Sequence, residues 1–134
     1  MVPDRQRDPV ATMIASDEAS RTLGIVVDSW GDGGASARMT VRADMVNGYE
    51  IAHGGLVFAL ADTAFAAACN SIAAPTVAAG ADITFVTSAR LGDELIATAQ
   101  LRTSFGRTGI YDVTVRRGDD IVAEFRGRSH RLNR

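Results

Sequence analysis

A single carboxylate inside an apolar run is the residue of this sequence best suited to chemistry. Asp62 follows Leu60 and Ala61, and the apolar residues 64–69 come after Thr63. Burial of an unpaired carboxylate is costly, and desolvation raises its pKa toward values useful for a general base. The structural alternative is that Thr63, an arginine or backbone donors satisfy Asp62. On position alone, a catalytic role and a structural role are equally supported.

The second candidate feature is the triplet His53, Gly54 and Gly55, which opens the same apolar run. Glycines at the start of a helix expose backbone N–H groups, and the helix dipole favours negative charge there. Such donors suit a carbonyl oxygen that becomes an oxyanion during a reaction. The alternative is an ordinary helix start with His53 in the cap region.

Spacing keeps these two features from acting together within one chain. Gly54 and Asp62 are eight residues apart, which is about 12 Å along a helix axis. A reacting carbonyl needs its partners within about 3 Å. If both residues are catalytic, each site takes Gly54 from one chain and Asp62 from another. This interpretation therefore predicts an oligomer.

The elements that position these residues follow from the hydrophobic pattern. Residues 54–70 form a long helix that is apolar on nearly every side and must be surrounded by other elements. A shorter amphipathic helix is expected between Val10 and Gly24. Strand-like segments begin at residue 25 and cover residues 35–43, 76–88, 94–103, 109–117 and 121–131, joined by short turns. One helix wrapped by a curved antiparallel sheet of about five strands gives an α+β fold.

Composition narrows the class of protein. The 134 residues fit a single domain, with residues 1–9 as a loose lead-in. A formal net charge of −2 argues against a nucleic-acid-binding protein. The apolar runs fall short of the roughly 18–20 residues of a membrane span, and the N-terminus lacks a secretory pattern, so a cytoplasmic protein is expected. The single cysteine, Cys69, predicts neither a disulfide nor a metal cluster.

These residues and spacings resemble the hotdog-fold acyl-CoA thioesterases of the phenylacetate-pathway (PaaI) type. The resemblance rests on Asn47, the His53–Gly54–Gly55 triplet and Asp62, and it extends through residues 108–112 and 125–131. It implies a hotdog fold and hydrolysis of an acyl-CoA to the free acid and CoA. It also implies a homo-oligomer, a dimer at minimum and a tetramer of two dimers in this branch. The CoA thioester is the substrate, so neither a cofactor nor a metal is implied.

The resemblance also implies roles for individual residues. Asp62 would act as general base or as nucleophile, and the Gly54 N–H, with Gly55 close by, would be the oxyanion donor from the partner subunit. His53 would orient the loop or assist the leaving thiolate, and Asn47 would position the thioester or the water.

The implied acyl group is phenylacetyl or a ring-hydroxylated relative. The expected acyl pocket lies beside Asn47 and Asp62, with Tyr49 and Phe58 among its lining residues, and Thr63 is a further expected substrate contact. Surface cations must bind the CoA phosphates, because the chain has no phosphate-binding glycine loop. The candidate cations are Arg90, Arg107 and Arg128.

Two other functions are compatible with such a fold. A hotdog hydratase carries a histidine five residues after the helix aspartate, but this chain has Ala67 there. A non-catalytic module that binds or senses acyl-CoA is the remaining alternative, although a transcriptional sensor would need a DNA-binding segment. Release of thiol from a panel of acyl-CoA substrates distinguishes an enzyme from a binding module.

Overall fold

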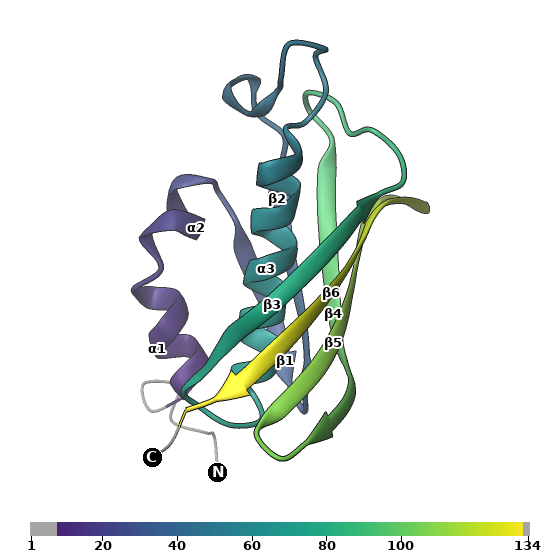
Figure 1. Cartoon of the computed structure of the whole chain (residues 1–134). Helices are drawn as coiled ribbons and strands as arrows, with labels where there is room; N and C mark the ends of the chain where they lie inside the picture. The colour runs from purple at the N-terminus through teal and green to yellow at the C-terminus, as the bar shows by residue number, and fades with distance from the viewer. Residues whose placement is uncertain (1–7, 133–134) are drawn as a thin grey trace.

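A long helix lies in the curve of a six-stranded antiparallel sheet (Figure 1). The computed structural model describes residues 8–132. The sheet order is β1-β2-β4-β5-β6-β3, and every neighbouring pair is antiparallel. The strands are β1 (Val26–Gly31), β2 (Gly34–Thr40), β3 (Thr76–Phe85), β4 (Glu94–Phe105), β5 (Thr108–Arg117) and β6 (Asp120–Arg131). The predicted α+β hotdog fold is confirmed, with six strands in place of about five.

The central helix α3 (Gly54–Asn70) has the bounds that the sequence predicts. Its sheet-facing side is made largely of alanines that are fully buried. Phe65 packs so closely on β6 that a Cβ at Gly127 would lie 2.7 Å from its ring. The sheet can therefore pack closely around α3 because most side chains at this contact are small. Among the described residues, no helix is both long and apolar enough to cross a membrane.

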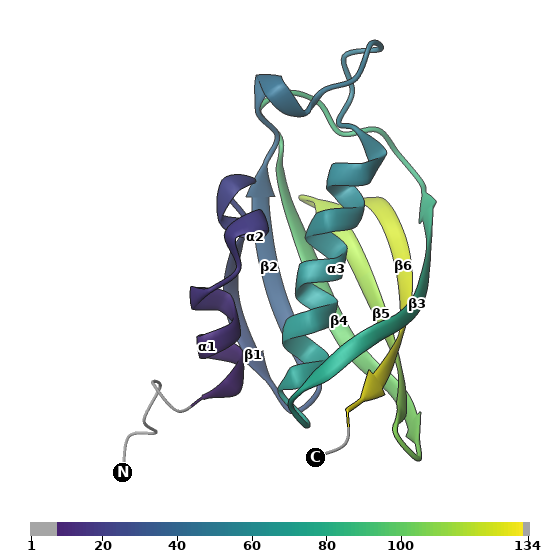
Figure 2. The same cartoon turned by 60° about the vertical axis from the view of Figure 1, so that its left-hand side comes forward.

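The expected single helix before β1 is two short helices, α1 (Pro9–Ala15) and α2 (Glu18–Thr22). Asp17 separates them, because its side chain accepts the Ser20 backbone N–H at 3.0 Å and so begins a second helix. Asp8 caps α1 in the same way. The predicted lead-in, residues 1–9, therefore ends too late, because Pro9 already belongs to α1. Residues 1–7 lie outside the described residues. Figure 2 shows α1 and α2 on one side of α3 and β3 on the other.

Strand β3 forms an edge of the sheet. Within residues 8–132 its backbone pairs only with β6, so its outer edge presents unpaired N–H and carbonyl groups. Asn70 fixes the start of the strand, since its side chain donates to the Thr76 carbonyl oxygen and accepts the Thr76 N–H. Val77, Phe85 and Val86 are exposed along or just beyond β3. An apolar, unprotected edge of this kind favours pairing with another strand.

The loop between β2 and α3 contains a short 3-10 helix, η2 (Ala43–Met45), followed by the tight turn that carries Asn47. The His53 N–H donates to the Met45 carbonyl oxygen at 2.8 Å. This bond holds the start of α3 against η2 and fixes where the helix begins.

Candidate active site

The two glycines at the start of α3 are not equivalent. His53 is the N-cap, and its Nδ1 accepts the Gly55 N–H at 3.0 Å. Nδ1 therefore carries no proton, and any ring proton lies on Nε2. The Gly54 N–H has no hydrogen-bond partner among the described residues. Gly54 is thus the glycine whose N–H is available to a ligand at the positive end of the helix dipole.

The ring of Phe85, at the end of β3, rests on Gly54. A Cβ added at Gly54 would lie 2.9 Å from the ring Cζ, so any side chain there must displace the ring. Phe85 is nevertheless 52% exposed. The glycine is therefore needed for a close approach of an aromatic side chain at the mouth of the site.

A cavity of about 280 Å³ lies beside the start of α3. Most of its lining is aliphatic or aromatic, with a few polar groups, as is usual for small-molecule sites. Its lining residues are Asn47, Ile51, Ala52, Gly54, Val57, Phe85, Val86, Thr87, Ser88, Ala89 and Val122. Gly54, whose N–H is free, thus lines an apolar cavity.

Asn47 contributes a second donor to this wall. Its Oδ1 accepts the Tyr49 N–H at 2.9 Å and the Ile51 N–H at 3.4 Å, which closes the loop. The Asn47 side-chain amide has no partner among residues 8–132. It can therefore donate to a carbonyl oxygen or to water in the cavity.

Asp62 is half-buried on α3, and its carboxylate has no hydrogen-bond or ion-pair partner within the described chain. Burial raises the pKa of Asp62, and the negative charge of Asp17 raises it further. Thr63 does not satisfy Asp62, because its hydroxyl lies 2.9 Å from the Ala59 carbonyl oxygen and 2.9 Å from Ser20 Oγ. The structural alternative considered for Asp62 is thus wrong for this chain, and the carboxylate is available as a base.

Asp62 does not line the cavity beside Gly54. Both residues belong to one continuous helix, so the separation of about 12 Å expected from the helical rise holds. One chain therefore presents the Gly54 N–H and the Asp62 carboxylate at two separate places along α3.

The two aromatic residues predicted to line the acyl pocket, Tyr49 and Phe58, are not among the residues that line the cavity beside Gly54. Tyr49 is 85% exposed and lies outside the cavity. Phe58 packs edge-on against Phe125, with ring centroids 5.2 Å apart. Their contact with substrate, like that of Thr63, stays a prediction for the assembled protein.

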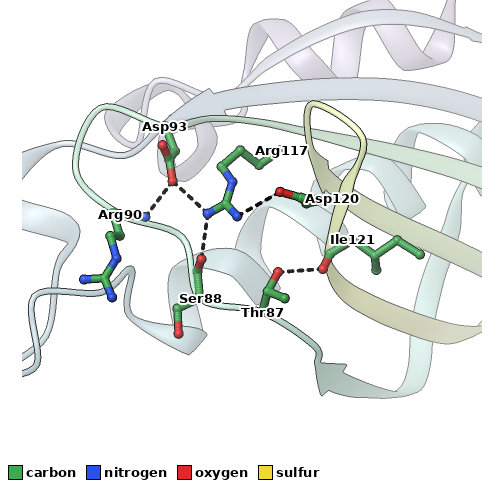
Figure 3. A network of polar contacts seen from close by, with 7 residues as sticks. All are labelled: Thr87, Ser88, Arg90, Asp93, Arg117, Asp120 and Ile121. Atoms are coloured by element: carbon green, nitrogen blue, oxygen red, sulfur yellow. Dashed lines mark hydrogen bonds and ion pairs between the residues drawn. The ribbon is translucent and has the colours of Figure 1, made fainter.

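The three candidate arginines are spread over the molecule. The backbone of Arg90 forms an isolated antiparallel β-bridge with that of Ile51, which lines the cavity. The Arg90 guanidinium points away from the polar contacts that Arg117 makes with Asp93 (Figure 3). Arg107 lies in the turn between β4 and β5, at the other end of α3. Arg128 lies over Gly80 and pairs with Asp82 at 3.7 Å. Arg90 is therefore the candidate whose chain neighbour, Ala89, lines the same cavity as Gly54.

A long helix wrapped by an antiparallel sheet is the arrangement of the hotdog fold. Residues 49–124 match the family model described as the Thioesterase superfamily. The chain is 46% identical to the acyl-coenzyme A thioesterase PaaI of Escherichia coli K12, over 90% of this chain and 86% of that protein. It is 28% identical to human acyl-coenzyme A thioesterase 13, over 92% of each chain.

The solved structures agree with this result. The E. coli PaaI protein from the phenylacetic acid degradation operon matches with a TM-score of 0.90 at 42% identity, over 96% of this chain and 94% of that chain. The chain belongs to the thioesterase superfamily, and it is an acyl-CoA thioesterase of the PaaI type. This membership favours an enzyme over the non-catalytic binding module.

Proposed function

We propose that this thioesterase hydrolyses phenylacetyl-CoA or a ring-hydroxylated relative in sites shared between two subunits. The observation that carries the proposal is the pair of unpartnered groups on α3, the Gly54 N–H beside an apolar cavity and the Asp62 carboxylate two turns further on. The acyl group is supported by the likeness to a PaaI protein from a phenylacetic acid degradation operon. Release of thiol from phenylacetyl-CoA tests the activity directly.

In the proposed reaction Asp62 takes a proton from water while the water oxygen attacks the thioester carbonyl carbon. The carbonyl electron pair moves onto oxygen, and the resulting oxyanion accepts the N–H of the partner subunit's Gly54. The oxyanion then collapses, the C–S bond breaks, and the CoA thiolate leaves and takes the proton from Asp62. The products are the free acid and CoA, and no cofactor takes part.

A nucleophilic role for Asp62 gives a different intermediate. Its carboxylate would attack the carbonyl carbon, expel the thiolate and form a mixed anhydride that water then cleaves. A single turnover in ¹⁸O-water with mass analysis of the enzyme tests for the anhydride, because water that cleaves the anhydride at the Asp62 carbon leaves its label in the Asp62 carboxylate, whereas water that attacks the thioester labels only the acid. In both routes we assign His53 to orienting the loop, since its Nδ1 is engaged by Gly55, and Asn47 to donating to the thioester or the water.

The second subunit in this proposal is another copy of the chain, docked along the β3 edge. Unpaired backbone groups and exposed Val77, Phe85 and Val86 favour such pairing. A two-fold antiparallel arrangement sets the Thr76 end of one strand against the Phe85 end of its partner, which brings the two α3 helices together. Light scattering is expected to give a dimer at minimum, with a tetramer as the larger assembly.

Arg90 is the proposed contact for CoA phosphates within the same subunit as the cavity. Its guanidinium makes no hydrogen bond or ion pair with the described residues, whereas Arg128 pairs with Asp82 at 3.7 Å. Arg107 lies at the far end of α3, so it could reach this ligand only across the subunit boundary.

We expect a higher kcat/KM for phenylacetyl-CoA than for palmitoyl-CoA. A compact ring fits an apolar cavity of about 280 Å³ and loses less rotational freedom than a flexible chain, so a difference of about tenfold or more is expected. Phe85→Ala enlarges the cavity and is expected to reduce the difference in kcat/KM between phenylacetyl-CoA and palmitoyl-CoA. Leu91→Ala, an exposed apolar residue in the loop that follows Phe85 but outside the cavity, is the matched control. A clear preference for long chains in the wild-type enzyme would remove the aryl assignment and leave the thioesterase assignment intact.

The pH dependence of activity should respond to Asp17. The negative charge of Asp17 raises the pKa of Asp62, so Asp17→Asn lowers that pKa and moves the acidic limb of the kcat/KM profile to lower pH. Asparagine caps a helix as well as aspartate, so α2 is retained. Ser20→Ala breaks the hydroxyl contact to Thr63 but keeps the charge, and should leave the limb in place. If the acidic limb of the kcat/KM profile stayed in place in Asp17→Asn, the charge of Asp17 would not control the pKa of the catalytic group.

A further inference from the structure

The loop 86–93, between β3 and β4, forms one wall of the apolar cavity through its first four residues. Its beginning is bonded to β6, because the Val86 N–H donates to the Val122 carbonyl oxygen at 2.8 Å. The Thr87 hydroxyl donates to the Ile121 carbonyl oxygen at 2.7 Å (Figure 3). The position of this wall therefore depends on how the loop is held against the turn between β5 and β6.

Arg117, the last residue of β5, joins this loop to that turn (Figure 3). Its Nη1 donates to the Ser88 carbonyl oxygen at 2.8 Å and to Asp93 Oδ2 at 3.2 Å. Its Nη2 donates to Asp120 Oδ2 at 3.2 Å. The same Asp93 oxygen accepts the Arg90 backbone N–H at 2.8 Å. One planar guanidinium thus fixes the loop, the start of β4 and the turn in a single geometry.

This arrangement differs from an exposed surface ion pair. The side chains of Arg117 and Asp93 are 31% and 26% exposed, so water screens their contact only in part. The bond to Ser88 is charge-assisted and acts on the backbone of the cavity wall itself. Arg117 does not line the cavity. It can act on a bound acyl group only through the loop.

We propose that Arg117 is a positioning residue of the acyl cavity, which holds the Ser88 carbonyl and so keeps the cavity wall formed by residues 86–89 in place for a compact acyl group. The inference rests on the proposed use of this cavity for the acyl group. A loop released from the guanidinium widens the cavity and weakens binding of a small ring more than it weakens binding of a long chain.

The test compares Arg117→Ala and Arg117→Lys with Arg126→Ala as the matched control. Arg126 makes a similar two-bond contact to Asp112, at 2.6 and 2.9 Å, on the outer face of the same two strands. We expect Arg117→Ala to raise KM for phenylacetyl-CoA about tenfold with a smaller change in kcat, since loss of positioning away from the chemistry costs up to about 10²-fold. Amide hydrogen exchange in residues 86–93 should become faster. Arg117→Lys should recover part of both effects, and Arg126→Ala should show neither.

Faster exchange in the loop of Arg117→Ala with an unchanged KM would overturn the proposal, because the loop would then be free without consequence for the substrate. Equal changes in Arg126→Ala would overturn it as well. Phe85→Ala separates this failure from failure of the proposed function. If Phe85→Ala alters the kinetics and Arg117→Ala does not, only the role of Arg117 falls. If Phe85→Ala changes no constant for either acyl-CoA, the cavity does not hold the acyl group, and the proposed use of the cavity falls together with the role of Arg117.

Discussion

Asp62→Asn is expected to lower kcat by roughly 10² to 10⁴, the range for loss of a general base. The amide keeps the shape of the side chain but cannot accept the proton of water or form an anhydride. Binding of a non-hydrolysable acyl-CoA analogue, measured by calorimetry, should change little. Near-wild-type turnover in Asp62→Asn would require another residue to be the base.

The same substitution should stabilise the fold. Burial raises the pKa of Asp62 in the folded chain above its unfolded value, so the folded state loses stability as the pH rises through the folded pKa. Asp62→Asn removes this loss, and its melting temperature should exceed that of the wild type at neutral pH. The difference should shrink as the pH falls below the folded pKa. Asp44→Asn is the control of opposite sign, because the hydrogen bond from Arg42 lowers the pKa of Asp44.

Two inactive variants should restore activity when they are combined in one dimer. Gly54→Pro removes the free N–H at the first position of α3, where proline is tolerated, and His53 already has the extended backbone (φ −61, ψ 130) that precedes proline. In a mixed dimer with Asp62→Asn, one shared site keeps both native groups and the other loses both. Mixed dimers purified through two different tags should therefore show about half of wild-type turnover.

The control for this experiment is Gly54→Ala. A Cβ at Gly54 displaces the Phe85 ring as proline does but leaves the N–H in place, so Gly54→Ala should retain more activity than Gly54→Pro. Mixed dimers no more active than their parents would show that each site lies within one chain, and the shared geometry would be abandoned.

The helix and strands could be predicted because their signals are local. Gly54 and Asn70 bound one continuous apolar run, and the alternation of Ala37 and Met39 with polar neighbours marks β2 as half-buried. The division between α1 and α2 was missed because Asp17 and Ser20 form a cap only once the chain has turned. That bond competes with the continuation of a single helix, and the sequence pattern does not decide between them.

The site could be predicted in its residue types but not in its surroundings. Asp62 and Gly54 stand out by their positions within and at the start of the apolar run. The choice of Gly54 over Gly55 depends on the orientation of the His53 ring. Phe85 reaches Gly54 because of the register of β3 on β6, a contact between distant parts of the chain. Interactions between remote segments are absent from a pattern of neighbouring residues.

The small side chains on the inner side of α3 limit how this enzyme can evolve. Ala61, Ala64, Ala67 and Ala68 have no exposed surface, and a larger residue at any of them would overpack the core at a cost of about 1–3 kcal/mol. Substitution of these alanines therefore destabilises the fold, so this side of the helix cannot be used to change catalysis. New acyl specificities are expected to arise by mutation of loops 46–52 and 86–93, which can vary while the helix that carries the chemistry is inherited unchanged.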